Sequence, residues 1–322
     1  MKKNYENKLM MILVGLIVFG TLLFGRSFLS LNTLMLFANQ LPEYGLIAMA
    51  LMVTLIVSGV NLSVVAMTTL SGIGGAILMN ANNNIDIVTV ILGVSMMIII
   101  GLLTGLINGV VISYLEVAPI IATLGTMLFF QGLSLNITKG GAITALNAEF
   151  TYLGSGSLLG IPIPIYIFAI VCIIIYWLLE KSEFGLKLYR IGKDPKAAKY
   201  SGIDVKKMTL LAYVLAGFIA GIAAIIMSSR YNSIRVDYGS SYLIYGIVIV
   251  SFGGVSLKGG KGSVRGVITS LIIVSVVTRL LNLASVDANV IEGIIGLMLL
   301  LSLIIQHLIN KKSVVKTAAD NK

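Results

Sequence analysis

Residues 208–228 read MTLLAYVLAGFIAGIAAIIMS, a stretch without a charged side chain. A helix that crosses a membrane needs roughly 20 consecutive, mostly apolar residues, so this stretch predicts a transmembrane helix. Similar apolar stretches follow one another along the chain with little sequence between them. Their approximate positions are 9–28, 44–60, 63–80, 86–115, 119–138, 163–179, 241–257, 264–283 and 290–309. The sequence therefore predicts an all-α polytopic membrane protein with about ten transmembrane helices.

The composition of the whole chain leads to the same fold class. Of its 322 residues, 57% are hydrophobic and 11% are charged, and the mean hydropathy is +1.01. Soluble domains carry about 25% charged residues. Because the apolar stretches fill the chain, we expect one transmembrane domain over 1–322 and no separate soluble domain. The single cysteine, Cys172, lies in an apolar stretch and predicts neither a disulfide framework nor a metal cluster.

The basic residues predict how the chain lies in the membrane. Cytoplasmic loops of membrane proteins carry an excess of Lys and Arg. If the first span leaves the cytoplasm and the spans alternate, 18 of the 23 Lys and Arg residues fall on the cytoplasmic side. We therefore expect both termini in the cytoplasm. The net charge of +10 then reflects topology, and the expected surrounding is the lipid bilayer, with no nucleic-acid partner.

One charged cytoplasmic loop, at about 180–207, carries the signals of a short helix. Asp194 is a good N-cap because its carboxylate accepts a free backbone N–H. Pro195 suits the first helical position, where no N–H is needed. Gly202 suits the position after the helix, where a left-handed backbone ends it. The loop is therefore predicted to contain a capped helix of about two turns.

A helix of this length is not stable alone in water, so it must rest on another surface. The side chains of Ala197 and Ala198, beside Lys196, are small enough to allow a close approach. One interpretation is a coupling helix that sits in a groove of a cytoplasmic ATPase. The other is a loop helix that packs on its own protein or lies on lipid headgroups.

A second cytoplasmic segment, 252–264, reads FGGVSLKGGKGSV. Glycine permits a positive φ and a close approach of backbones. A phosphate-binding loop would need the pattern GxxxxGK[ST] between a strand and a helix, which this segment lacks. We expect a tight turn between two spans, or a second contact with a cytoplasmic partner. The residues on which the expectation rests are Gly254, Ser256, Gly259, Gly260 and Gly262.

Polar side chains within spans are costly and are often functional. Four amides are candidates for hydrogen bonds to a polar solute on its way through the membrane: Asn61, Asn108, Gln131 and Asn136. No carboxylate stands clearly in the middle of a predicted span, as a proton- or sodium-driven carrier would need. No cluster of His, Cys and carboxylates suggests a metal site or an enzyme active site. The pattern therefore favours transport over catalysis.

Three segments resemble the membrane permeases of ribose and simple-sugar ABC importers, a group that includes autoinducer and nucleoside importers. Residues 121–126, IATLGT, resemble the family's "TLG" span start. Residues 193–203 resemble its "G-x-N-P-E-A-A…S-G-I" loop, and residues 252–263 its "GG-x-S-L-x-G-G-x-G-S" turn. The resemblance covers most of the chain and is strongest at 180–310. One departure is at residues 61–65, NLSVV, where the family commonly has "D-L-S-V-G".

The resemblance implies a role and a set of partners. The chain would be a permease in a bacterial cell membrane for a sugar or similar solute, of the ribose, galactose, nucleoside or autoinducer class. A second permease chain, identical or a sister, would complete the pathway. Cytoplasmic ABC ATPase subunits would bind ATP and magnesium and would contact the helix at 194–202, while this chain binds no cofactor. A solute-binding protein would deliver the solute from outside. The alternative is a stand-alone secondary carrier or channel.

Overall fold

The computed structural model describes residues 2–80 and 87–319, and most of these residues are helical. The long helices are α1 (Lys2–Phe24), α2 (Leu31–Ile56), α3 (Val64–Asn80), α4 (Ile87–Ser113), α5 (Pro119–Thr138), α7 (Ile163–Glu180), α10 (Val205–Tyr231), α12 (Val264–Leu283) and α13 (Ala288–Ala319). The short ones are η1 (Gly25–Ser27), α6 (Ala148–Ser155), α8 (Glu183–Lys193), α9 (Pro195–Tyr200) and α11 (Tyr242–Phe252).

Seven helices within the described residues are long and apolar enough to cross a membrane: Glu6–Ser27, Thr33–Ile56, Ile87–Ser113, Pro119–Thr138, Ile163–Glu180, Val205–Tyr231 and Val264–Leu283. Two further apolar helices are shorter, at Val64–Asn80 and Tyr242–Phe252, and α13 is apolar over Ala288–Ile304, the part whose side chains the structure describes. Every predicted stretch therefore contains a helix, but the expectation of about ten full spans is confirmed only in part. The first residue of the predicted stretch 86–115 lies outside the described residues.

The second span differs most from its prediction, because α2 begins at Leu31 and not near residue 44. Ser30 caps the helix by accepting a hydrogen bond from the backbone N–H of Thr33 at 3.3 Å. Pro42 lies inside the helix, where neighbouring helices and local adjustments make a proline tolerable in a membrane protein. The polar residues before position 44 therefore belong to the span and not to a loop.

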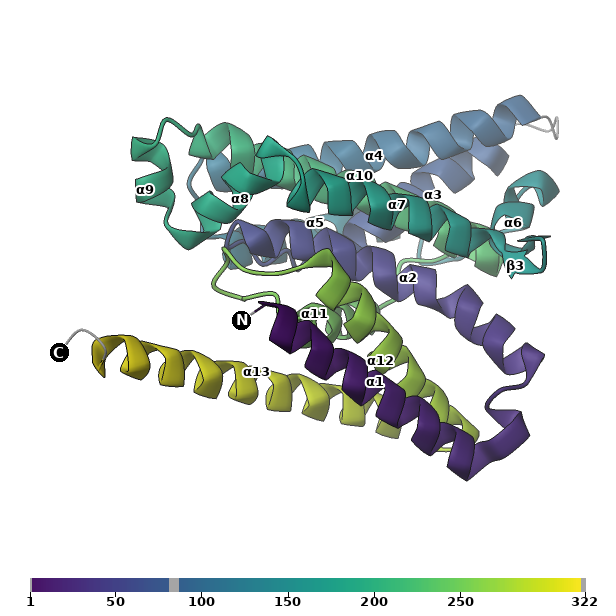
Figure 1. The fold of residues 1–322 in the computed structure, drawn as a ribbon. Helices are drawn as coiled ribbons and strands as arrows, with labels where there is room; N and C mark the ends of the chain where they lie inside the picture. Colours follow the sequence, from purple (N-terminus) through teal and green to yellow (C-terminus); the bar gives the residue numbers. More distant parts are fainter. Residues whose placement is uncertain (1, 81–86, 320–322) are drawn as a thin grey trace.

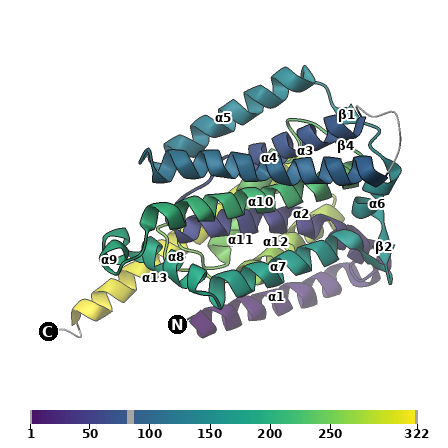
Figure 2. The ribbon, with the colours of Figure 1, turned by 90° about the horizontal axis from the view of Figure 1, so that it is seen from above.

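The helices lie roughly side by side, and each end of the bundle has its own features (Figure 1). The first residues of α1, the last turns of α13 and the helices α8 and α9 lie at one end, here called the α9 end; α6 and β3 lie at the opposite α6 end. Figure 2 shows the same arrangement from above, with α5 leaning away from the other helices. The start of α1, the last turns of α13 and the central charged loop thus share one end of the bundle.

The most extensive contact between helices is that of α4 with α10. Gly101 and Gly105 on α4 face Gly217 on α10, and a Cβ on Gly101 or Gly217 would overlap the carbonyl oxygen of the other residue. Small residues let helices approach in this way when lipid supplies no hydrophobic drive for packing. The spacing of four between these α4 glycines is therefore a packing signal.

Short strands close the α6 end of the bundle. β1 (Ile143–Thr144) pairs antiparallel with β4 (Ser233–Ile234), so the chain after α5 is held against the chain after α10. β2 (Ser157–Leu158) and β3 (Ile161–Pro162) form a small hairpin between α6 and α7. These contacts fix the polar segment between α10 and α11, which lines the cavity described below.

Candidate functional site

α9 is capped by the residues that the sequence suggested. The Asp194 carboxylate accepts hydrogen bonds from the backbone N–H groups of Lys196 at 2.9 Å and Ala197 at 3.0 Å. Pro195 occupies the first helical position. Gly202 follows the helix with a φ of +79°, a conformation that glycine adopts without strain. Local sequence thus accounts for the whole of this helix, from its start to its end.

The two alanines of α9 face opposite ways. Ala198 is buried in the core of its own chain, whereas Ala197 is exposed. Tyr200 is 93% exposed at the last position of the helix. Exposed basic side chains surround this free surface: Arg190, Lys193, Lys196 and Lys199. Ala197 and Tyr200 therefore offer a small and a large contact on a positively charged face that no other described part of the chain covers.

α8, which the sequence analysis did not predict, connects α9 to the bundle. Ser182 caps it by accepting a hydrogen bond from the N–H of Gly185 at 3.4 Å. One side of the helix, Gly185, Leu188, Ile191 and Gly192, is buried, while Arg190 is exposed. An apolar stripe of this kind marks an amphipathic helix on a protein surface. The signal was present in the sequence but is hidden by the high charge of the loop.

The two glycine-containing motifs meet at one point, here called the Gly192 junction (Ile56, Ser58, Gly192, Lys258 and Gly260). The Ser58 hydroxyl contacts the carbonyl oxygens of Gly192 at 3.2 Å and Lys258 at 2.8 Å. The Gly260 N–H donates to the Ile56 carbonyl oxygen at 2.9 Å. A Cβ on Gly192 would overlap that same carbonyl. The junction therefore joins α8, the end of α2 and the turn before α12.

In the turn itself, several backbone amides bond to carbonyl oxygens of the chain. The backbone N–H groups of Ser256 and Gly259 donate to the carbonyl oxygens of Lys261 and Ser256, each at 3.0 Å. Gly254, Gly259 and Gly260 have φ values of +78°, +82° and +69°. The glycines are thus required by the turn and by the close approach of α8. The backbone amides of Ser256, Gly259 and Gly260 therefore have partners inside the protein.

Tyr189 adds a further hydrogen bond between α8 and the same turn. Its hydroxyl donates to the Gly262 carbonyl oxygen at 3.1 Å. Burial raises the pKa of the Tyr189 hydroxyl, so the group remains a neutral donor. α8 is therefore fastened to the turn through a side chain as well as through the backbone.

Two of the four amides nominated for the pathway, Asn61 and Asn108, belong to one buried polar cluster. Both are fully buried. The Asn61 side-chain oxygen accepts from the Ser63 hydroxyl at 2.7 Å, and the Asn108 amide nitrogen donates to that hydroxyl at 2.8 Å. The Thr126 hydroxyl donates to the Asn108 oxygen at 2.6 Å. The cluster therefore joins the turn before α3 to α4 and α5.

A partly open cavity of about 370 Å³ lies beside this cluster, between α3, α5 and the segment before α11. Its walls are largely apolar, with Leu62, Val65, Ala66, Met127, Leu135 and Leu243 among them. Four polar side chains reach it: Gln131, Arg235, Asp237 and Ser240. Arg235 and Asp237 form an ion pair at 2.7 Å. Apolar walls with a few polar groups are typical of small-molecule sites.

The structure separates the two remaining amides on α5. Gln131 lines the cavity, whereas Asn136 is exposed on the helix and is not among the lining residues. The polar residues between α10 and α11 were missed as cavity residues because they read as an ordinary connecting loop. Their signal was the run of Ser, Arg, Asn and Asp at 228–241 between two apolar stretches.

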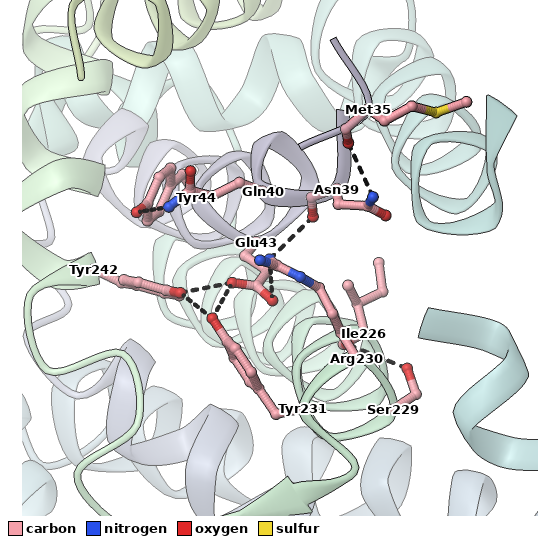
Figure 3. Close-up of polar contacts among 10 residues, drawn as sticks. All are labelled: Met35, Asn39, Gln40, Glu43, Tyr44, Ile226, Ser229, Arg230, Tyr231 and Tyr242. Atoms are coloured by element: carbon pink, nitrogen blue, oxygen red, sulfur yellow. Dashed lines mark hydrogen bonds and ion pairs between the residues drawn. The ribbon is translucent and has the colours of Figure 1, made fainter. Parts of the chain in front are cut away.

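The sequence places no carboxylate clearly in the middle of a predicted span, but the structure has Glu43 buried within α2, whose apolar span is Thr33–Ile56 (Figure 3). Its carboxylate forms an ion pair with Arg230 of α10 at 2.8 Å. The hydroxyls of Tyr242 and Tyr231 donate to its other oxygen at 2.6 Å and 3.2 Å. Arg230 also donates to the Asn39 carbonyl oxygen at 3.1 Å. The pair was missed because residues 29–43 were placed outside the spans.

Comparison with known proteins places the chain among transport proteins. A family model described as "Branched-chain amino acid transport system / permease component" matches residues 33–303. The chain is 34% identical over 282 residues, 85% of both chains, to the ribose import permease protein RbsC of Bacillus subtilis. It is 28% identical over 297 residues, 90% of this chain and 88% of the other, to the autoinducer 2 import system permease protein LsrD of Escherichia coli. No solved structure matches.

Proposed function

This chain belongs to the family of branched-chain amino acid transport system / permease components, and from this membership we propose that it forms the membrane pathway of an ATP-driven importer for a sugar or a similar small polar solute. The resemblance to ribose and simple-sugar permeases is confirmed. The chain is a multi-pass membrane permease, a transport subunit and not an enzyme, and its relatives are bacterial. Because relatives are named for ribose and autoinducer 2, ribose is the first solute to test.

The partners follow from the same membership and from the two ends of the bundle. An ABC ATPase binds at the α9 end and holds ATP and magnesium, and a solute-binding protein docks at the α6 end. A second permease chain, identical or a sister, completes the pathway in the bilayer. This arrangement puts the α9 end and both termini in the cytoplasm, as the distribution of Lys and Arg favours.

The observation that carries the proposal is the free face of α9. The helix has capped ends, lies at the extremity of the bundle (Figure 1) and presents the exposed Ala197 and Tyr200 among basic side chains. We assign this face to the ATPase groove and expect an acidic rim around that groove. Ala198 supports this face indirectly, because its side chain is buried in the core of its own chain and holds α9 in place.

Movement of α9 reaches the rest of the permease through α8 and the Gly192 junction. The junction holds α8 against the end of α2 and the turn before α12. Gly254, Ser256, Gly259, Gly260 and Gly262 thus serve the coupling by shaping that turn. A displacement of the docking helix therefore acts first on α2 and on the turn that leads to α3.

The cavity beside α5 is the proposed part of the solute pathway. Gln131 offers a hydrogen bond to a hydroxyl group, and the apolar wall suits the C–H faces of a sugar ring. Asn61 and Asn108 hold that wall in place, since Leu62 directly follows Asn61 and Met127 follows Thr126. Asn136 is proposed to contact the pathway only in the assembled complex, because its side chain is exposed in this chain.

A pair of substitutions on α5 tests this assignment. Gln131→Leu is expected to lower the uptake of ribose about two- to tenfold, the effect of losing one or two neutral hydrogen bonds. Asn136→Leu, the same change on the same helix outside the cavity, tests the other amide of α5. The control is Gly132→Ala, where nothing lies within 4 Å of an added Cβ, and it is expected to leave uptake near that of the wild type. Initial rates of labelled ribose uptake in membrane vesicles provide the measurement. A loss with Asn136→Leu but not with Gln131→Leu would move the pathway to the outer face of α5.

A further inference from the structure

The Glu43 network (Glu43, Arg230, Tyr231 and Tyr242) is a charged cluster, built around one buried carboxylate, that the proposed function leaves unexplained. Glu43 is 1% exposed, and an ionisable residue within a membrane span is expensive and is a functional candidate by default. Apolar residues of similar size often replace a buried ion pair without loss of stability. Stability alone is therefore a weak reason for a carboxylate and a guanidinium at this place.

The network ties three helices together at one level of the bundle. Glu43 comes from α2, Arg230 and Tyr231 from the last turn of α10, and Tyr242 from the first turn of α11 (Figure 3). The two tyrosine hydroxyls also lie 2.9 Å from each other. Between Tyr231 and Tyr242 runs the segment that contains the cavity residues Arg235 to Ser240. The carboxylate thus holds both ends of the cavity-lining segment.

α2 connects this network to the docking end. From Glu43 the helix continues without a break to Ile56, about 20 Å at 1.5 Å per residue. Residues 44–56 are buried throughout, so this part of α2 is supported on all sides. Ile56 is itself a member of the Gly192 junction. One helix therefore carries the junction at its end and the Glu43 network in its middle.

We propose that Glu43 is a positioning residue for transport: it fixes the cavity-lining segment 235–243 to α2, so that a movement imposed on the junction reaches the solute cavity. The proposal rests on the proposed function, since it assigns a transmission route to the same cavity. Tyr242 takes part directly because its hydroxyl donates to Glu43 and Leu243, the next residue, lines the cavity. If the hydrogen bonds to Glu43 were lost, α2 would move while the cavity wall stayed in place.

The first test compares uptake with ATP hydrolysis in the intact complex, reconstituted in vesicles with its ATPase and binding protein. Glu43→Gln keeps the shape of the side chain and removes the charge, and Tyr242→Phe removes one donor. We expect ATP hydrolysis to stay near the wild-type rate while ribose taken up per ATP falls about tenfold, the scale of a lost charge-assisted hydrogen bond. Normal uptake per ATP in both variants would overturn the proposal.

A neighbouring tyrosine provides the matched control. The hydroxyl of Tyr44 accepts a hydrogen bond from Gln40 at 2.7 Å within α2, and its ring packs against Tyr242 and Tyr245. Tyr44→Phe keeps that ring packing and is expected to leave uptake per ATP unchanged. If Glu43→Gln fails to fold, the proposal is still tested by comparing the uptake per ATP of Tyr242→Phe with that of Tyr44→Phe. An equal loss of uptake per ATP in both phenylalanine variants would show that the network serves only packing, and it would overturn the proposal.

A second test does not depend on the ATPase. In a chain with Cys172→Ser, Leu243→Cys puts a thiol into the cavity wall, and the rate at which this thiol reacts with a water-soluble reagent reports on access to that wall. Glu43→Gln is expected to raise that rate severalfold, and Tyr44→Phe is not. An unchanged rate with Glu43→Gln would contradict the inference even if transport is ATP-driven. The wild-type complex could show no ATP-driven uptake while Glu43→Gln still raises the rate of the thiol reaction. The proposed function would then be wrong, but the link between Glu43 and the cavity wall would be supported.

Discussion

Gly192→Ala is expected to abolish transport, because a single methyl group forces α8 away from α2. A Cβ at this position would overlap the Ile56 carbonyl oxygen and would lie 2.5 Å from the Gly260 backbone nitrogen. Both obstacles are backbone atoms, which cannot rotate aside as a side chain does. The hydrogen bonds of the Gly192 junction, from Ser58 and from Gly260, would be lost with the contact.

The expected cost is about 3 kcal/mol or more, from overpacking together with two lost hydrogen bonds. The purified permease should melt at a clearly lower temperature in detergent, and the complex should show no ATP-driven uptake. Gly125→Ala is the matched control, since nothing lies within 4 Å of a Cβ at that position of α5. Equal melting temperatures for the two variants would show that the junction is not closely packed.

Ala197→Glu is expected to leave the permease folded and to remove its ATPase. The side chain is exposed on α9, so a carboxylate there meets water in the isolated permease. In the complex it would be buried in a groove whose rim we expect to be acidic, at a cost of about 3–5 kcal/mol. The affinity for the ATPase should therefore fall more than about a hundredfold.

Two further variants separate docking from folding. Ala198→Glu puts the same charge into the chain's own core, so it should lower the melting temperature as well as ATPase binding. Ser155→Glu adds an exposed carboxylate to α6, at the opposite end of the bundle, and should change neither property. The measurements are the melting temperature and the ATPase retained by the tagged permease. Full ATPase retention by Ala197→Glu would place the interface elsewhere.

The sequence predicts what local physical chemistry determines. The caps of α9 depend on Asp194, Pro195 and Gly202, which are close neighbours in the chain. Glycines at a spacing of four on α4 mark a helix face that another helix can approach closely, although they do not say which helix. The family resemblance came from the same short motifs. These features need no knowledge of distant partners.

What the sequence hides is compensation between distant residues. Glu43 reads as a loop residue because no local group offsets its cost in a membrane. Arg230, 187 positions further along the chain, neutralises the carboxylate and also donates to the Asn39 carbonyl oxygen at 3.1 Å. The start of α2 could therefore not be placed without the packing of α10. The cavity likewise forms between segments that are far apart in the sequence.

The most direct test of the central claim is ATP-driven uptake by the native complex. The tagged permease is captured from its own membranes in mild detergent, its partners are identified by mass spectrometry, and the complex is reconstituted in vesicles with labelled ribose and the binding protein. The account predicts that an ABC ATPase co-purifies and that ribose accumulates only with ATP inside the compartment where α9 lies. A folded permease that brings no ATPase and accumulates the solute on an ion gradient would contradict it.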